Sequence, residues 1–174
     1  MTPRLRKFAL TAHVTFSVGW LGAVACTLAL AVAGLTSRDA QTVRAAYLAL
    51  ELTGWFVLVP LSVASLVAGL VQALGTKWGL FRHYWVLAKL LMNVLATTVL
   101  LLYTQTLGSL ADVAAETTLS RDDLDFLRTP SVVLHSGAAL VLLLVATVLA
   151  VYKPRGMTPY GQRKQSEQRA ASQP

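Results

Sequence analysis

The fold of this chain is decided by a stretch near its C-terminal end, residues 131–152, which reads SVVLHSGAALVLLLVATVLAVY. It lies within 24 consecutive residues, between Arg128 and Lys153, that contain no Asp, Glu, Lys or Arg. About 20 apolar residues suffice to cross the hydrocarbon core of a bilayer as a helix. The stretch does not alternate apolar and polar residues, so it predicts a transmembrane helix rather than a barrel strand.

Three further windows lack charged residues in the same way. They contain 30, 25 and 22 residues and lie between Lys7 and Arg38, between Glu51 and Lys77, and between Lys89 and Asp112. We therefore predict an all-α protein, a four-transmembrane-helix bundle within residues 1–153. The expected spans are about 9–34, 45–73, 83–107 and 131–152. The first run ends in the signal-peptidase-like Ala31-Val-Ala33, but it is longer than a signal peptide, so we expect it to be retained.

The composition agrees with a lipid-facing protein. Of the 174 residues, 55% are hydrophobic and 13% are charged, against roughly 25% charged residues in a typical soluble domain. The net charge of +7 lies at the chain ends and in loops, so we expect a bilayer partner and no nucleic acid. The single cysteine, Cys26, excludes an intramolecular disulfide.

The distribution of Lys and Arg predicts the orientation. With the N-terminus inside, ten of these residues lie inside and four outside, and Lys89 lies within a span. The positive-inside rule therefore favours an N-in/C-in topology with both termini cytoplasmic. We expect a short outward amphipathic helix between Ser120 and Pro130, with Leu124 and Leu127 on the membrane surface. The basic tail, residues 154–174, has nothing to bury and is expected to be disordered.

Four ionisable residues lie inside the predicted spans, where charge is costly. By helical rise, His13 and Lys89 lie roughly 9 Å from the cytoplasmic edge, and Glu51 and His135 lie roughly 10 Å from the outer edge. The sequence thus predicts an inner polar layer of His13 and Lys89 and an outer layer of Glu51 and His135, all facing inward. For each, a functional role and a structural role are both open.

Helical spacing groups other residues with them. One expected face of the second span carries Glu51, Trp55, Leu58, Ser62, Ser65, Gly69 and Gln72, and one face of the first carries His13, Ser17 and Trp20. Gly19, Gly22 and Cys26 form a small-residue face that predicts contact with a neighbouring helix. Pro60 is expected to kink the second span by leaving the carbonyl of Phe56 without its helical partner.

Several of these residues carry a family resemblance. They are His13-Val-Thr-Phe-Ser-Val-Gly-Trp20-Leu-Gly22, Pro60 with Gly69, Trp85-Val-Leu-Ala-Lys89-Leu-Leu, and Tyr152-Lys153-Pro154-Arg155-Gly156. From about residue 8 to 164 the chain resembles the bacterial membrane family catalogued as domain of unknown function 2269. That family is similar to the copper-resistance D membrane proteins and to the four-helix bacterial protoporphyrinogen oxidase. The resemblance implies a bacterial inner-membrane location.

The resemblance to the oxidase implies a haem site. In that family a first-span His and a third-span Lys are functional and haem b is bound; His13 and Lys89 match these positions. Two of its features are missing here, because Tyr103 and Gln105 stand where its third span ends in His, and its charged last-span motif is absent. For copper, His13 would have Met92 as its one soft partner.

Three functions follow as hypotheses. The first is haem or porphyrin binding, or related redox chemistry, through His13 and Lys89. The second is metal or small-solute transport along the two polar layers, which requires a homo-oligomer or a membrane partner because four helices enclose little lumen. The third is a structural or accessory membrane subunit. No soluble catalytic motif is present, so the sequence assigns no enzymatic reaction.

Overall fold

The computed structural model describes residues 2–75, 79–116 and 118–171 of the chain. Within these ranges the regular elements are α1 (Pro3–Thr36), α2 (Ala40–Thr53), the π-helical turn η1 (Gly54–Leu58), α3 (Val59–Gly75), α4 (Tyr84–Ala115), α5 (Arg121–Leu127), α6 (Ser131–Tyr152) and α7 (Pro159–Ala170). The β-type pairing found among the described residues is one isolated antiparallel bridge between His83 and Met157. The prediction of an all-α protein is confirmed.

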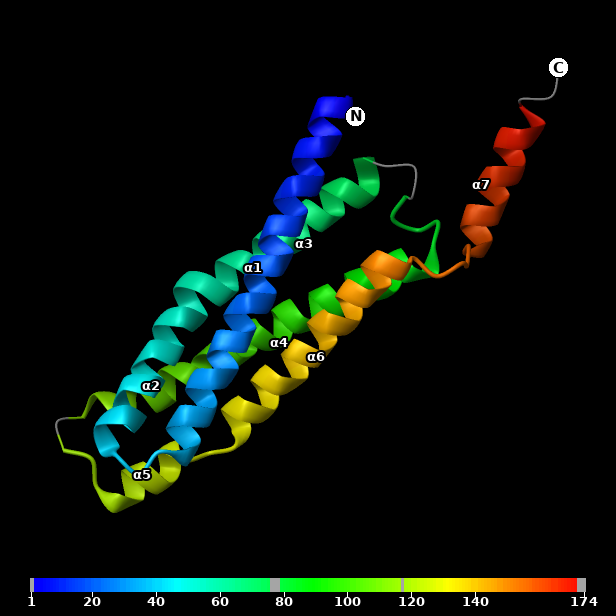
Figure 1. The fold of residues 1–174 in the computed structure, drawn as a ribbon. Coiled ribbons are helices and arrows are strands. Elements are labelled where there is room, and N and C mark those ends of the chain that lie inside the picture. The colour runs from blue at the N-terminus through cyan, green and yellow to red at the C-terminus, as the bar shows by residue number, and fades with distance from the viewer. Residues whose placement is uncertain (1, 76–78, 117, 172–174) are drawn as a thin grey trace.

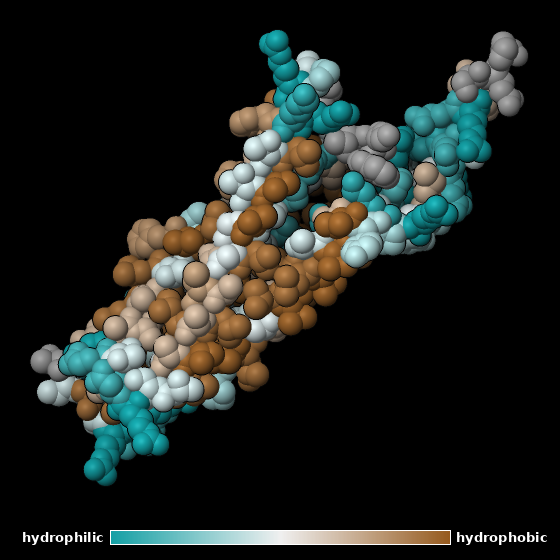
Figure 2. All heavy atoms as spheres, viewed as in Figure 1, coloured by the Kyte–Doolittle hydropathy of each residue, from teal (hydrophilic) through white to brown (hydrophobic). Residues whose placement is uncertain are grey.

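Four helical stretches are long and apolar enough to cross a membrane: Pro3–Thr36, Ala40–Gly75, Tyr84–Ala115 and Arg121–Tyr152. They coincide with the four predicted spans except at their ends. Figure 2 shows apolar side chains over the middle of the molecule and hydrophilic side chains at both ends. The exposed apolar side chains suit a hydrocarbon environment, where they need no protein cover.

The helices form a bundle with two distinct ends (Figure 1). α1 packs against α2 and α3 and against α6, while α4 packs against α2, α3 and α6. We call the end that carries α5 the α5 end, and the end that carries both chain termini the α7 end. Two clusters of buried side chains form the core. One lies at the α5 end and includes Tyr47, Leu107 and Leu127, and the middle cluster contains Trp20, Val24, Leu58 and Leu143.

The third span continues well past residue 107, where the sequence predicted its end. Its extra turns are held by packing, because Leu107, Leu110 and Ala114 are all buried in the α5-end cluster. These positions follow the helical spacing of three and four residues, so one face of the extension is apolar. Hydropathy alone could not show that the residues after 107 continue the helix rather than form a loop.

The second span bends where the sequence predicted a kink. Pro60 has no N–H to donate. The helical hydrogen-bond pattern changes just before it, so that the Val59 N–H donates to the carbonyl of Gly54, five residues earlier. The result is the π-helical turn Gly54–Leu58, and such turns change the direction of a helix. Figure 1 shows α3 leaving α2 in a changed direction, which carries α3 behind α1 toward the α7 end.

The short helix α5 forms where it was predicted. Ser120 and Asp123 make a capping box, in which the Asp123 N–H donates to Ser120 Oγ at 3.1 Å and the Ser120 N–H donates to Asp123 Oδ2 at 2.8 Å. The expected surface position of Leu124 and Leu127 is wrong. Leu127 is fully buried in the α5-end cluster and Leu124 packs against it, because α5 folds back onto α2 and α4.

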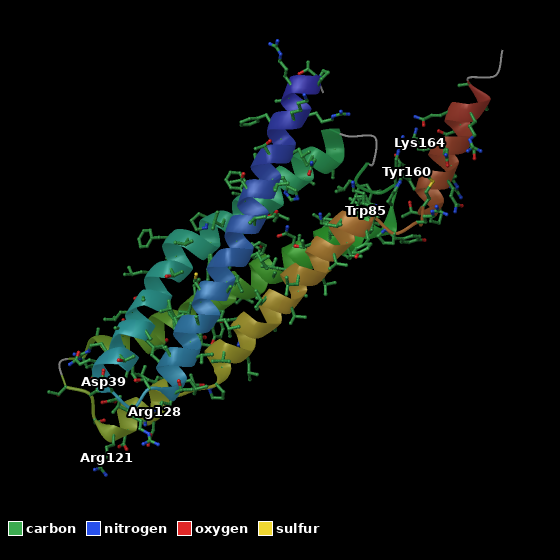
Figure 3. The ribbon with its side chains drawn as sticks, viewed as in Figure 1. Asp39, Trp85, Arg121, Arg128, Tyr160 and Lys164 are labelled. Atoms are coloured by element: carbon green, nitrogen blue, oxygen red, sulfur yellow. The ribbon has the colours of Figure 1, made fainter. Side chains whose placement is uncertain are left out.

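Two longer-range contacts fix α5 to the bundle. The Tyr47 hydroxyl donates to the carbonyl of Leu127. An Arg128 guanidinium nitrogen donates to the carbonyl of Ser37 in the loop between α1 and α2, at 3.2 Å. Figure 3 shows Arg128 and Asp39 together at this end of the molecule. These two contacts therefore join the end of α5 to α2 and to the loop before α2.

The expected disorder of residues 154–174 is wrong for α7. Thr158 caps this helix by accepting the Gly161 N–H at 3.1 Å, and Pro159 occupies its first turn. The Thr158 N–H also donates to the carbonyl of Arg82 at 3.0 Å, and its hydroxyl donates to the carbonyl of Phe81 at 2.5 Å. The segment before α4 thus anchors α7, a polar helix without the apolar face that would have predicted its packing. Figure 3 shows Tyr160 and Lys164 on α7.

Candidate functional site at the α7 end

His13 lies on α1 and is held by the facing helix α3. Its Nδ1 lies 3.2 Å from the carbonyl oxygen of Ser65, and the hydroxyls of Ser17 and Ser65 are 2.9 Å apart. The close approach depends on Gly69, because a Cβ at Gly69 would lie 3.0 Å from His13 Cε1. The predicted shared face of His13 and Ser17 is therefore confirmed, together with the facing small residues of α3.

The contact with Ser65 assigns the tautomer of the neutral His13 ring. A carbonyl oxygen can only accept a hydrogen bond, so Nδ1 carries the proton and donates it. Nε2 then presents a lone pair, for which the described residues provide no hydrogen-bond partner. A histidine fixed through Nδ1 by a backbone carbonyl is the usual arrangement for a histidine that ligates a metal through Nε2.

Lys89 lies on α4, and its side chain is half-buried. Its charge acts on His13, and the charge of Lys153, at the end of α6, acts on Lys89. The two salt bridges found among the described residues join Arg128 to Asp125 and Lys164 to Glu167, so neither provides a counter-ion for Lys89.

The α7 end is packed more loosely than the rest of the bundle. The two core clusters contain no residue of α1 before Trp20, so the level of His13 lies outside them. Figure 1 shows α1 and α3 diverging here from α4 and α6, and Figure 2 shows the surface hollowed between α1 and α6. His13 and Lys89 are both partly exposed. The arrangement places a nitrogen lone pair and a cation where an anionic ligand can reach them.

The expected outer layer does not form a paired site. Glu51 is half-buried on α2, and no hydrogen bond or ion pair links it to His135 among the described residues. His135 is exposed, contrary to the inward placement expected for it. Its ring stacks on Tyr103, with centroids 4.1 Å apart, and its Nδ1 lies 2.8 Å from the carbonyl of Ser131. Sequence reasoning did not predict this grouping.

Several expected faces are only partly correct. Ser62 and Ser65 are buried on α3, as the stripe predicted, but Trp55 is 49% exposed because the π-helical turn rotates the residues around it. The small-residue face of α1 is correct only at Gly19, where an added Cβ would lie 3.6 Å from Leu61 of α3. Cys26 is exposed, and a Cβ at Gly22 would meet nothing within 4 Å.

The clustering of potential ligand side chains does not support the expected metal site. The described residues include no group of three or more His, Cys, Asp and Glu side chains that could hold a metal ion. Met92 is half-buried one helical turn from Lys89, and a pairing of His13 with Met92 stays a prediction.

Comparison with protein families, with curated proteins and with solved structures finds no match for this chain. The resemblance described above therefore stays an expectation.

Proposed function

We propose that this chain is an integral membrane protein that binds haem b, or a closely related anionic porphyrin, at His13 and Lys89. The hydrogen bond from His13 Nδ1 to Ser65 carries the proposal, because it leaves Nε2 as a directed ligand. Lys89 supplies the positive charge that a propionate of the porphyrin requires. His13 would hold the group through Nε2.

The chain's own residues would orient and neutralise the group. Ser65 fixes the His13 ring, and Gly69 leaves room for it. Lys89 and Lys153 make this end of the bundle cationic. When bound, haem would supply one-electron chemistry.

Absorption spectroscopy of the purified protein in nanodiscs, titrated with haem, tests the proposal. The wild type should develop a shifted Soret band that His13→Ala abolishes. Lys89→Met removes the charge at similar length and should weaken haem binding by roughly 10- to 100-fold. His135→Ala is the matched control, because it removes a histidine at the α5 end and should leave the spectrum unchanged.

Two results would contradict haem binding. One is a wild-type protein that shows no Soret shift after haem loading. The other is a His13→Ala variant that binds haem as well as the wild type. If His13→Ala and Lys89→Met alter only thermal stability, the site is structural and the chain is an accessory subunit.

We also propose that the α7 end faces the cytoplasm of a bacterium. The excess of Lys and Arg in segments of this end supports this orientation. Asp122→Cys and Ser166→Cys, each in a Cys26→Ala background, test it with a membrane-impermeant maleimide on cells whose outer membrane is permeabilised. Cys at position 122 should react and Cys at position 166 should be protected; the reverse pattern contradicts the orientation.

A further inference from the structure

A second cavity lies apart from His13 and Lys89. It has a volume of about 260 Å³ and is bounded by α1, η1, α4 and α6. Its inner wall consists of buried side chains, including Trp20, Val24 and Leu58. Its rim includes Leu95 and Val99 of α4 and two residues of α6, all exposed in the bundle.

The position of this rim decides how a ligand enters. Leu95 and Val99 belong to the apolar middle of a membrane-spanning helix, and the α6 rim residues, His135 and Ala138, belong to another. The cavity therefore opens sideways between α4 and α6, toward the surface that lipid covers. A ligand reaches it from within the bilayer and must dissolve there.

The lining excludes a charged ligand. No Asp, Glu, Lys or Arg lines the cavity. The lining hydroxyls of Thr27 and Ser136 donate to carbonyl oxygens of their own helices, at 2.9 and 2.6 Å. The Trp20 indole nitrogen is fully buried and has no hydrogen-bond partner among the described residues. The Thr27 and Ser136 oxygens can still accept a hydrogen bond, but both residues are buried, and the Tyr103 hydroxyl is paired with that of Ser131. His135 is the exposed polar residue at the rim, so an entering polar atom meets it first.

His135 is held in one orientation. Its Nδ1 donates to the carbonyl of Ser131 at 2.8 Å, its ring stacks on Tyr103, and the Tyr103 and Ser131 hydroxyls are 2.9 Å apart. By the tautomer argument used for His13, Nε2 of the neutral ring carries a lone pair and can only accept. The described residues offer it no hydrogen-bond donor. The cavity thus provides an oriented acceptor at its rim, beside an apolar channel.

We propose that this cavity binds a membrane-dissolved, uncharged alcohol, whose hydroxyl donates to His135 Nε2 and whose hydrocarbon chain lies along α6. From Val132 to Leu142 the lining extends about 15 Å by helical rise. A volume of about 260 Å³ over that length leaves room for a narrow chain rather than a broad ring system. The hydroxyl sits at the rim, because that is where His135 lies.

Photolabelling in nanodiscs with hexadecanol carrying a diazirine tests the site. The alcohol probe should label the wild type on the lining segments of α4 and α6. It should label roughly three- to ten-fold more strongly than the methyl ether of the same chain, because the ether cannot donate a hydrogen bond. His135→Phe keeps the stacked ring and should abolish this preference. Ala139→Leu fills the cavity and should reduce labelling by both probes.

Val141→Leu is the matched control, because Val141 is an exposed residue of α6 outside the cavity lining. It should label as the wild type does, and size-exclusion profiles should show that all variants are folded. Unlabelled hexadecanol and decylhydroquinone serve as competitors. Competition by hexadecanol identifies an aliphatic hydroxyl as the ligand group, and competition by decylhydroquinone identifies a phenolic one. Failure of both, equal labelling by alcohol and ether, or labelling unchanged by Ala139→Leu would overturn the proposal.

Discussion

His13 of α1 packs directly against Gly69 of α3, where an added Cβ would lie 3.0 Å from His13 Cε1. Two helices remote in sequence thus approach closely enough for the imidazole to reach the backbone carbonyl of Ser65. Because this carbonyl occupies Nδ1, the same contact determines which nitrogen is available to a ligand.

Gly69→Val should displace the His13 ring. The added methyl groups overlap the ring, which costs about 1–3 kcal/mol unless the ring moves away from Ser65. NMR of isotope-labelled histidine should then show loss of the single Nδ1–H tautomer, and haem affinity should fall by roughly ten-fold or more. Gly22→Val is the control, since a Cβ there meets nothing within 4 Å. An unchanged His13 spectrum in Gly69→Val would contradict the packing.

Tyr47→Phe should destabilise the α5 end. The Tyr47 hydroxyl donates to the carbonyl of Leu127, and both residues are fully buried, so the variant loses a buried hydrogen bond, although this carbonyl still accepts the Thr129 N–H at 2.8 Å. The free energy of unfolding should fall by about 0.5–1.5 kcal/mol in a denaturation series in mixed micelles. Tyr152→Phe alters a tyrosine that is 79% exposed and should change little. Equal effects of the two substitutions would count against the contact.

Gly161→Val should detach α7 from the bundle. A Cβ at Gly161 would lie 2.4 Å from the carbonyl oxygen of Arg82, a backbone atom that cannot move aside cheaply. Thr158→Val should act in the same direction by removing the bond to Phe81 and the helix cap. Hydrogen exchange across residues 159–170 should accelerate in both variants, while α6 stays protected. Ser166→Ala, on the exposed part of α7, should not have this effect; unaltered exchange in Gly161→Val would refute the anchoring.

The capping box of α5 should make that helix sensitive to acid. Hydrogen bonds from the side chain and then the backbone of Ser120 hold the pKa of the Asp123 carboxyl below its ordinary value. The carboxylate therefore stabilises α5 above the pKa of an unfolded Asp, about 3.9. This stabilisation is lost as the pH falls through the lowered pKa of the folded state. The protection of the α5 amides against hydrogen exchange, taken relative to the intrinsic rate at each pH, should fall below about pH 4.

Two variants test the origin of that acid sensitivity. Asp123→Asn cannot titrate, so the protection of the α5 amides should no longer depend on pH in this range. Asp39→Asn, which removes the charge at the N-cap of α2 but keeps an oxygen that can accept there, should leave the pH profile of α5 protection unchanged. The pKa of Asp39 is itself held low by the Thr42 side chain, then by backbone N–H groups of Thr42 and Gln41. A profile of α5 that follows Asp39 instead would contradict the assignment.

The four spans were predictable because their signal is one-dimensional. A helix that crosses hydrocarbon must be apolar for about 20 residues, and charge-free windows reveal this without any knowledge of neighbours. Ser120 with Asp123 and the position of Pro60 were equally local signals, because a cap or a missing N–H acts within one or two turns. The extension of α4 past residue 107 was not local, since its buried residues are held by α2 and α5.

His13 and His135 differ in a way that depends on tertiary packing. Each is a histidine near one end of a charge-free window, and this position can be read from the sequence alone. Which way each side chain faces depends on the rotation of its helix and on its neighbour. Gly69 admits His13 between α1 and α3, whereas His135 lies at the rim between α4 and α6. Apolar residues surround both helices, so no amphipathic pattern encodes that rotation, and packing between helices sets it.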